Sequence, residues 1–315
     1  MGWSCGRSSF TGRLAERTGG VRRLLTRPRL LLLLVAVVLL LSVGSTTPAG
    51  AAPASRPSST ARSPEVMAEL FRRVADGREG CAVLMDAETG AVLFEAGAAR
   101  CSKRFSPCST FKLPLALMAF DQGVVTLDSQ FKWDGKTRVY ASWNRHQTTV
   151  TWMRESVVWV SQQIAHRLGR PTMDRYLGRF AYGNRDISGG LDRAWLGESL
   201  EISALEQVRF LARLWTGKLP LHAGVAGQVE GLLLRDEYPS GAVLLGKTGS
   251  GLRCLRDASG RPLQDRQLGW FVGCVKKNGR TVVFAMNITD LQIREPAGRV
   301  TRGVVKRLLV ELGFL

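Results

Sequence analysis

The sequence predicts an α/β (α+β) fold in which both ends of the chain build one antiparallel sheet around a mainly helical insertion. Two observations carry this prediction. Short apolar runs bounded by turn residues lie at both ends, whereas apolar residues in the middle recur with a helical period. We expect the sheet region at about 65–100 and 240–315, and the helical region at about 101–239. With 315 residues, 45% of them hydrophobic, the chain can form one large domain or two small ones, and we expect one, at 65–315.

The expected strands follow from alternating or continuous apolar runs. Residues 81–86 and 91–94 predict a hairpin, because turn residues separate them. Residues 242–249 predict a strand that runs into a glycine turn. Lys-Lys-Asn-Gly at 276–279 predicts the turn of a second hairpin. The strands of this second hairpin are expected at 268–275 and 281–287. One helix is expected before the first hairpin, at 65–74, and one after the second, at 301–312.

The expected helices of the middle part follow from apolar periodicity and capping residues. An apolar run after Ser109 predicts a helix that ends near Gly123, whereas residues 131–150 show no clear period and predict loops. Ser203, with Glu206 three positions later, predicts a capping box. The helix after this box is expected at 205–215. The other helices of the middle part are expected at 156–168, 172–180 and 225–234.

Residues 1–51 predict a secretory signal peptide. Residues 1–29 carry seven arginines and one glutamate, residues 30–43 are almost wholly apolar, and Ala-Gly-Ala at 49–51 matches a cleavage pattern. The apolar run is shorter than the roughly 20 residues that span a bilayer, so we expect no stable membrane anchor. Arg22-Arg23 also permits twin-arginine export, although ordinary export fits better. Residues 52–64 predict a flexible lead-in, and the mature protein is expected to be periplasmic or secreted.

The charge distribution argues against nucleic-acid binding. Loss of the signal peptide lowers the net charge from +18 to about +12. The remaining arginines are scattered, and no basic motif is interleaved with aromatic residues. We expect a solvated basic surface on a monomer or homodimer.

An odd number of cysteines remains after cleavage, so at least one thiol is free or pairs between chains. Cys108 directly precedes Ser109; it is a buried thiol or a disulfide partner of Cys101 or Cys254. No Cys-x-x-Cys occurs and the three histidines lack ligand spacing, so we expect no metal site. The five cysteines are Cys81, Cys101, Cys108, Cys254 and Cys274.

Ser109 and Lys112 are the first candidate catalytic residues. A spacing of three places the hydroxyl and the amine on one face of a helix. Serine is a weak nucleophile until a base removes its proton, and a lysine can do so when burial keeps it neutral or when it is modified. The pair alone is also consistent with a capped surface helix.

Three further stretches make the pattern specific: Ser156-Val-Val158, Tyr182-Gly-Asn184 and Lys247-Thr-Gly249. With them, the chain resembles the class D (oxacillinase-type) serine β-lactamases, over about residues 81–305. The resemblance implies the serine β-lactamase and penicillin-binding-protein fold and makes residues 65–315 a catalytic domain. Five further stretches also look like that family: 131–135, 143–145, 195–197, 202–204 and 269–273.

The resemblance implies catalytic roles. Ser109 would be acylated by the β-lactam, and Lys112 would carry CO2 as N6-carboxylysine and act as general base, with no other cofactor. Trp195 would hydrogen-bond the carbamate and Ser156 would relay a proton to the lactam nitrogen. From the residues alone, Trp195 could simply pack in the core and Ser156 could be a helix N-cap.

The resemblance also implies substrate contacts. Lys247 and Thr248 would hold the substrate carboxylate, with Gly249 allowing close backbone approach. The N–H groups of Ser109 and Ser250 would form the oxyanion hole. Val158 would be an apolar neighbour of Lys112. Arg299 aligns with a carboxylate-binding arginine, although Arg294 and Arg302 compete for that role.

The expected function is hydrolysis of β-lactams, penicillins and oxacillin-type compounds among them, which would confer resistance. A β-lactam sensor, or a penicillin-binding domain that stays acylated, is the alternative. A sensor of this kind normally follows several membrane spans, and a peptidoglycan transpeptidase would lack the Tyr-Gly-Asn and Trp-Phe-Val-Gly motifs. A basic envelope-binding protein with an inactive site is the least supported.

Overall fold

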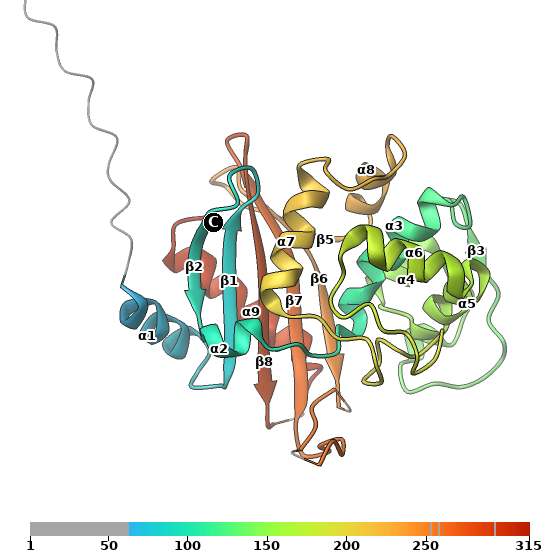
Figure 1. The fold of residues 1–315 in the computed structure, drawn as a ribbon, viewed down its shortest axis with the longest axis horizontal. Coiled ribbons are helices and arrows are strands. Elements are labelled where there is room, and N and C mark those ends of the chain that lie inside the picture. Colours follow the sequence, from blue (N-terminus) through green and yellow to red (C-terminus); the bar gives the residue numbers. More distant parts are fainter. Residues whose placement is uncertain (1–62, 253, 258, 293) are drawn as a thin grey trace, which may run out of the picture. The chain divides into compact units, whose positions relative to one another are not determined.

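A six-stranded antiparallel sheet forms the centre of the structure, a computed structural model that describes residues 63–315 except 253, 258 and 293 (Figure 1). The predictions for the signal peptide, 1–51, and for nearly all of the lead-in, 52–64, concern residues outside this range and stay predictions. The strand order is β2-β1-β8-β7-β6-β5. The strands are β1 (Gly80–Asp86), β2 (Val92–Ala96), β5 (Leu234–Glu237), β6 (Val243–Gly251), β7 (Gln267–Lys277) and β8 (Arg280–Asp290).

Both ends of the described chain meet in this sheet, as predicted. β1 pairs with β8 over seven residues, from Gly80 opposite Ile288 to Asp86 opposite Val282. Alternate side chains of β8 enter different cores: Val283 and Ala285 lie on one face, and Phe284 and Met286 on the other. This period of two, with both faces covered, explains why the strand reads as a continuous apolar run.

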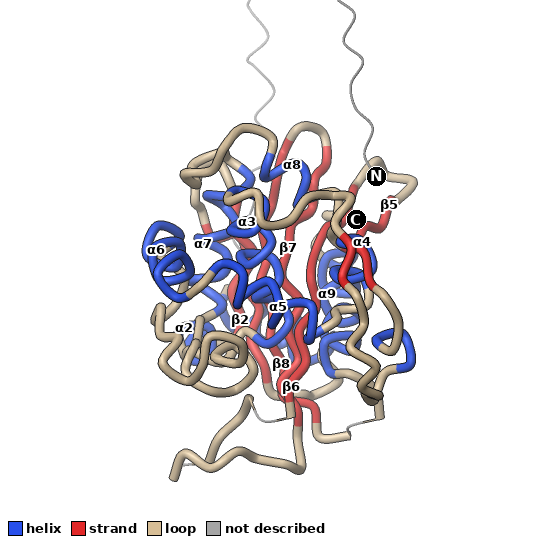
Figure 2. The backbone as a smooth tube through the Cα atoms, turned by 90° about the vertical axis from the view of Figure 1, so that its right-hand side faces the viewer, coloured by secondary structure: helices blue, strands red, loops and turns tan. Residues whose placement is uncertain are grey.

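Helices cover both faces of the sheet (Figures 1 and 2). α1 (Pro64–Val74) and α9 (Ala297–Glu311) contribute Leu70, Val304 and Leu308 to the core of one face. α7 (Ala204–Trp215) packs on β1, β7 and β8 at the opposite face. The rest of the helical region consists of α2 (Ala98–Ser102), η1 (Cys108–Phe111), α3 (Lys112–Asp121), η2 (Ala141–Trp143), α4 (Thr149–Arg154), α5 (Val158–Leu168), α6 (Arg170–Phe180) and α8 (Val225–Glu230). Within the described part of the chain, no helix has the length and apolarity that a membrane span requires.

Two local predictions are confirmed by hydrogen bonds and backbone angles. Ser203 Oγ accepts from the Glu206 N–H at 3.1 Å and the Glu206 carboxylate accepts from the Ser203 N–H at 2.9 Å, which completes the capping box of α7. Asn278 and Gly279 both have positive φ, of 50° and 74°, as a two-residue type I′ hairpin requires.

Two local expectations were wrong, and one alternative for Ser156 is excluded. The helix expected at 225–234 ends at Glu230, and Leu234 begins β5, because this segment pairs with the edge of β6. Residues 130–131 and 147–148 form a short strand pair, β3 and β4, within the region expected to be loops. The N-cap of α5 is Val157, so Ser156 does not cap that helix.

Candidate active site

The nucleophile candidate lies in a strained turn between the sheet and α3. Ser109 is the second residue of η1, a 3₁₀ turn that leads directly into α3, whereas the sequence suggested a regular helix from Ser109 onward. Cys108 immediately before it has φ of 49°, in the left-handed region that non-glycine residues rarely occupy. Such strain is often found at functional sites. Ser109 remains partly exposed, so its hydroxyl is accessible.

The lysine candidate lies one turn further along, and its amine faces the serine. Lys112 Nζ donates to Ser109 Oγ at 3.3 Å. The side chain is only 1% exposed. Burial holds the pKa of the Lys112 amine well below its usual range, and the nearby charge of Lys247 lowers it further. A neutral amine is therefore favoured beside the hydroxyl, as the predicted chemistry requires.

Phe111, the residue directly before Lys112, packs against Trp195. Their rings stack with centroids 5.0 Å apart and an interplanar angle of 25°. The Trp195 segment is fixed by Ser106, whose Oγ donates to the Trp195 carbonyl at 2.7 Å and accepts from the Gly197 N–H at 3.0 Å. Trp195 thus lies next to η1, which carries Ser109 and is called the nucleophile turn below, and beside Phe111, the residue that precedes Lys112.

Strand β6 brings a second buried lysine to the same place. Lys247 Nζ donates to Ser156 Oγ at 3.0 Å and to the Thr248 carbonyl at 2.9 Å. Burial lowers the pKa of the Lys247 amine to about 7. Ser156 has φ of 58° and is followed two residues later by Val158, the first residue of α5. The backbone bend before α5 therefore aims the Ser156 hydroxyl at β6 instead of at the helix terminus.

Gly249 explains how β6 can lie against the nucleophile turn. A Cβ at this position would be 3.0 Å from the Pro107 carbonyl oxygen and 3.1 to 3.2 Å from atoms of Thr110. Contacts of this length would push the strand and the turn apart. The glycine of the Lys-Thr-Gly motif thus permits the close approach that the sequence predicted.

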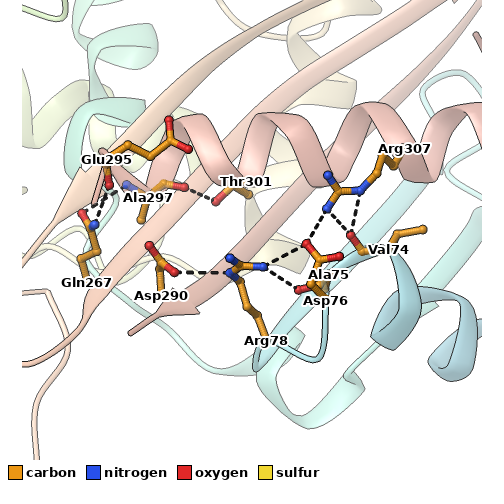
Figure 3. Close-up of polar contacts among 10 residues, drawn as sticks. All are labelled: Val74, Ala75, Asp76, Arg78, Gln267, Asp290, Glu295, Ala297, Thr301 and Arg307. Carbon is orange, nitrogen blue, oxygen red and sulfur yellow. Dashed lines mark hydrogen bonds and ion pairs between the residues drawn. The ribbon is translucent and has the colours of Figure 1, made fainter. Parts of the chain in front are cut away.

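The end of β6 is supported by the first turn of α9. The Gly298 N–H donates to Ser250 Oγ at 2.9 Å, so the Ser250 side chain is engaged by the helix. Gln267 fixes this turn by donating to the Glu295 carbonyl at 2.7 Å and accepting from the Ala297 N–H at 3.1 Å (Figure 3). The helix start and the strand end are therefore held as one unit.

Of the three candidate arginines, the structure removes Arg302 from consideration. Its guanidinium pairs with Asp236 at 2.5 Å, on β5. Arg299 is exposed on the first turn of α9, next to Gly298, and its side chain makes no hydrogen bond or ion pair within the described ranges. Arg294 lines a hollow of about 420 Å³ together with Ser250 and Tyr140. Arg299 and Arg294 thus both remain near the end of β6.

Sequence reasoning did not identify the polar side chains that support the nucleophile turn from below. Thr110 Oγ1 donates to the Pro107 carbonyl at 2.7 Å, and Gln207 Nε2 donates to Thr110 Oγ1 at 3.2 Å. Gln207 is 1% exposed on the buried face of α7. A glutamine on the apolar stripe of a helix, three residues after Ala204 and four before Leu211, is the signal that could have found it.

The described residues contain no cluster of three or more His, Cys, Asp or Glu side chains that could hold a metal ion. The candidate reactive groups that the structure brings together are two hydroxyls and two buried amines.

Comparisons with known proteins identify the family. The family described as the penicillin binding protein transpeptidase domain matches residues 80–309. β-Lactamase OXA-9 of Klebsiella pneumoniae is 39% identical over 247 residues, which cover 75% of this chain and 87% of that protein. The chain belongs to the class D β-lactamases. β-Lactamase OXA-48 of the same species is 37% identical over 212 residues, covering 66% of this chain and 76% of that protein.

Solved structures confirm the class D β-lactamase fold. The OXA-427 class D β-lactamase superposes with a TM-score of 0.68 at 33% identity, covering 75% of this chain and 99% of that chain. The C-terminal domain of the Bacillus licheniformis BlaR penicillin-receptor gives a TM-score of 0.70 at 28% identity, covering 79% and 95%. The family assignment makes this chain a β-lactam-hydrolysing enzyme, while the fold itself is shared with a receptor.

Proposed function

We propose that the protein hydrolyses β-lactam antibiotics, penicillins and oxacillin-type compounds among them, through an acyl-serine intermediate on Ser109. The observation that carries the proposal is the buried Lys112 amine, 3.3 Å from Ser109 Oγ and depressed in pKa. An enzyme of this kind confers β-lactam resistance on the cell that exports it.

Lys112 fits the chemistry of carbamate formation. Only a neutral amine attacks CO2, and burial favours that form. Once formed, N6-carboxylysine supplies an oxygen base for the Ser109 proton and later for the proton of the deacylating water. Trp195, beside Phe111, would donate a hydrogen bond to that oxygen base. No other cofactor is proposed.

Each of the other candidate residues would have its own role in acylation. Ser109 Oγ attacks the lactam carbonyl as its proton leaves to the base at Lys112. The N–H groups of Ser109 and Ser250 would hold the developing oxyanion, where one missing donor typically costs about 10²–10³ in rate. Ser156, already bound by Lys247, would pass a proton to the lactam nitrogen as the ring opens.

The substrate carboxylate would bind at the end of β6. Lys247 and Thr248 offer an amine and a hydroxyl there, and Arg299 adds a charged group from α9. Val158 would form an apolar wall at the start of α5. Gly249 keeps this binding strand close to the nucleophile turn.

Export completes the proposal. The signal-like start, residues 1–51, would direct the mature protein to the periplasm or the medium, where β-lactams are met first. We propose no membrane anchor and no nucleic-acid partner, and a monomeric or homodimeric state.

A β-lactam receptor that stays acylated is the second candidate, favoured by the likeness to the BlaR domain. Steady-state hydrolysis of a chromogenic cephalosporin and of oxacillin, with mass spectrometry of the protein during turnover, separates the two. Hydrolysis with a short-lived adduct on Ser109 supports the proposal. A stoichiometric adduct that persists without turnover overturns it in favour of the receptor. Ser109→Ala should remove both turnover and adduct while the melting temperature changes little, because a small, partly exposed hydroxyl is lost.

A further inference from the structure

Two cysteines from distant parts of the sequence meet directly behind the nucleophile. Cys108 Sγ lies 2.8 Å from Cys254 Sγ, although 146 positions separate the residues. Carbon atoms pack best at about 3.5–4.0 Å and sulfur is larger, so these sulfur atoms are closer than non-bonded contact allows. A disulfide bond is about 2.05 Å long, so a small movement would join them.

Gly251 lies so close to the two sulfur atoms that no larger residue fits there. A Cβ on Gly251 would lie 2.1 Å from Cys254 Sγ and 2.8 Å from Cys108 Sγ. Cys108 itself adopts φ of 49°, which turns its side chain into this space. Both features are explained if the loop after β6 is folded around a sulfur pair.

We propose that Cys108 and Cys254 form a disulfide in the exported protein, which staples the nucleophile turn to the segment after β6. Ser109 directly follows one end of this bond, and Ser250 lies four residues before the other. The bond would fix the distance between the two N–H groups proposed for the oxyanion hole. The inference does not depend on the proposed function, because the state of the thiols is measured independently of hydrolysis.

The structure indicates which sulfur reacts first. Cys254 is 8% exposed and lines a cavity, whereas Cys108 is 1% exposed. Charged residues of both signs line this cavity: Arg100, Lys103, Arg104, Arg256 and Arg266, and Glu79, Glu201 and Asp257. The hydrogen bond from Cys108 lowers the pKa of the Cys254 thiol, and burial raises that of Cys108. Of the two buried thiols, Cys254 is therefore the more exposed and the more acidic.

Oxidation requires a disulfide-containing oxidant, of low molecular weight or on an exported thiol oxidoreductase. The Cys254 thiolate attacks this disulfide and expels one thiolate from it. Cys108 loses its proton and attacks Cys254 Sγ of the mixed disulfide, which expels the second thiolate. The two cysteines lose two protons and two electrons, and the oxidant is reduced to two thiols.

The first test is peptide mapping of the mature protein after export into an oxidising compartment. The protein is denatured with an alkylating reagent and no reductant, digested, and analysed by mass spectrometry. We expect a Cys108–Cys254 linked peptide in most molecules, with Cys274 alkylated as an internal control. Recovery of Cys108 and Cys254 both alkylated, even after incubation with oxidised glutathione, would overturn the proposal.

The second test measures whether the bond acts as a staple. Reduction with dithiothreitol should lower the melting temperature of the wild type by about 5–15 °C, as loss of a disulfide that closes a long loop does. Cys254→Ala should melt near the reduced wild type and ignore dithiothreitol. Cys274→Ala, which removes another buried thiol, should still respond to the reductant. A wild type that melts equally with and without dithiothreitol would refute the staple.

Discussion

The link between Gln267 and the first turn of α9 gives a prediction whose size can be worked out. Gln267 is 5% exposed, and its amide holds the Glu295 carbonyl at 2.7 Å and the Ala297 N–H at 3.1 Å. Gln267→Leu keeps the side-chain volume but leaves both backbone groups without this partner. A buried unsatisfied group costs about 1–3 kcal/mol, and the carbonyl at the more exposed Glu295 costs less.

The expected loss is therefore about 3 kcal/mol, or about 6–12 °C in melting temperature for a domain of this size. Activity should fall as well, because the same turn carries Gly298, which binds Ser250 at 2.9 Å. A misplacement of 1 Å costs about 10²-fold in rate, so a partial shift of the Ser250 N–H predicts roughly a tenfold lower kcat/KM.

Thermal unfolding and nitrocefin hydrolysis, measured on one preparation, check both numbers. Gln228→Leu is the matched control, because Gln228 is exposed on α8 and its side chain makes no hydrogen bond in the described structure. If Gln267→Leu melted within 1–2 °C of the wild type and kept its kcat/KM, the inferred coupling between Gln267, α9 and β6 would be refuted.

Three further predictions concern the two buried lysines and the close approach of β6. Activity should fall as the pH drops below neutral and recover with added bicarbonate, because protonation of Lys112 removes the amine that binds CO2; ¹³C NMR with labelled bicarbonate should show a carbamate, and full activity without that signal would exclude N6-carboxylysine. Lys247→Met should abolish productive substrate binding yet raise the melting temperature at pH 7–8. The folded pKa of Lys247 is about 7, against 10.5 normally, so the unfolded chain binds an extra proton between these values and stability rises with pH there. Met should remove this rise of stability with pH. If the melting temperature of the variant depended on pH as that of the wild type does, burial would not cost the charged Lys247 amine what its pKa implies. Gly249→Ala should lower kcat/KM by about tenfold or more with a smaller effect on stability, because its Cβ, 3.0 Å from the Pro107 oxygen, must displace the nucleophile turn; a wild-type kcat/KM would show that the turn yields freely.

Local chemistry made parts of this structure predictable from the sequence. The Ser203–Glu206 capping box and the Asn278-Gly279 turn each depend on a few neighbouring residues, and both form as predicted. The spacing of Ser109 and Lys112 likewise placed two side chains together before the fold was known. Each of these predictions required only short-range geometry.

Features that depend on distant contacts were missed or left open. The segment at Leu234 has a helical appearance, but pairing with β6 makes it a strand. The bend at Ser156 directs its hydroxyl to Lys247, and the spacing of residues in the sequence does not predict a positive φ at this serine. The partner of Cys108 could not be chosen from spacing, since only the fold brings the loop after β6 behind the nucleophile turn.

The pairing of β1 with β8 also orders events during synthesis (Figure 1). β1 emerges first, but the neighbour that fills its inner edge, β8, emerges some two hundred residues later. Until then α7 has no completed sheet to pack on, and the nucleophile turn lacks the strand β6 against which it lies. The sheet therefore cannot be completed until the last hairpin, formed by β7 and β8, has been synthesised. Under the proposed export, this late closure would leave the chain unfolded while it crosses the membrane, and the candidate active site would form only once the chain is complete.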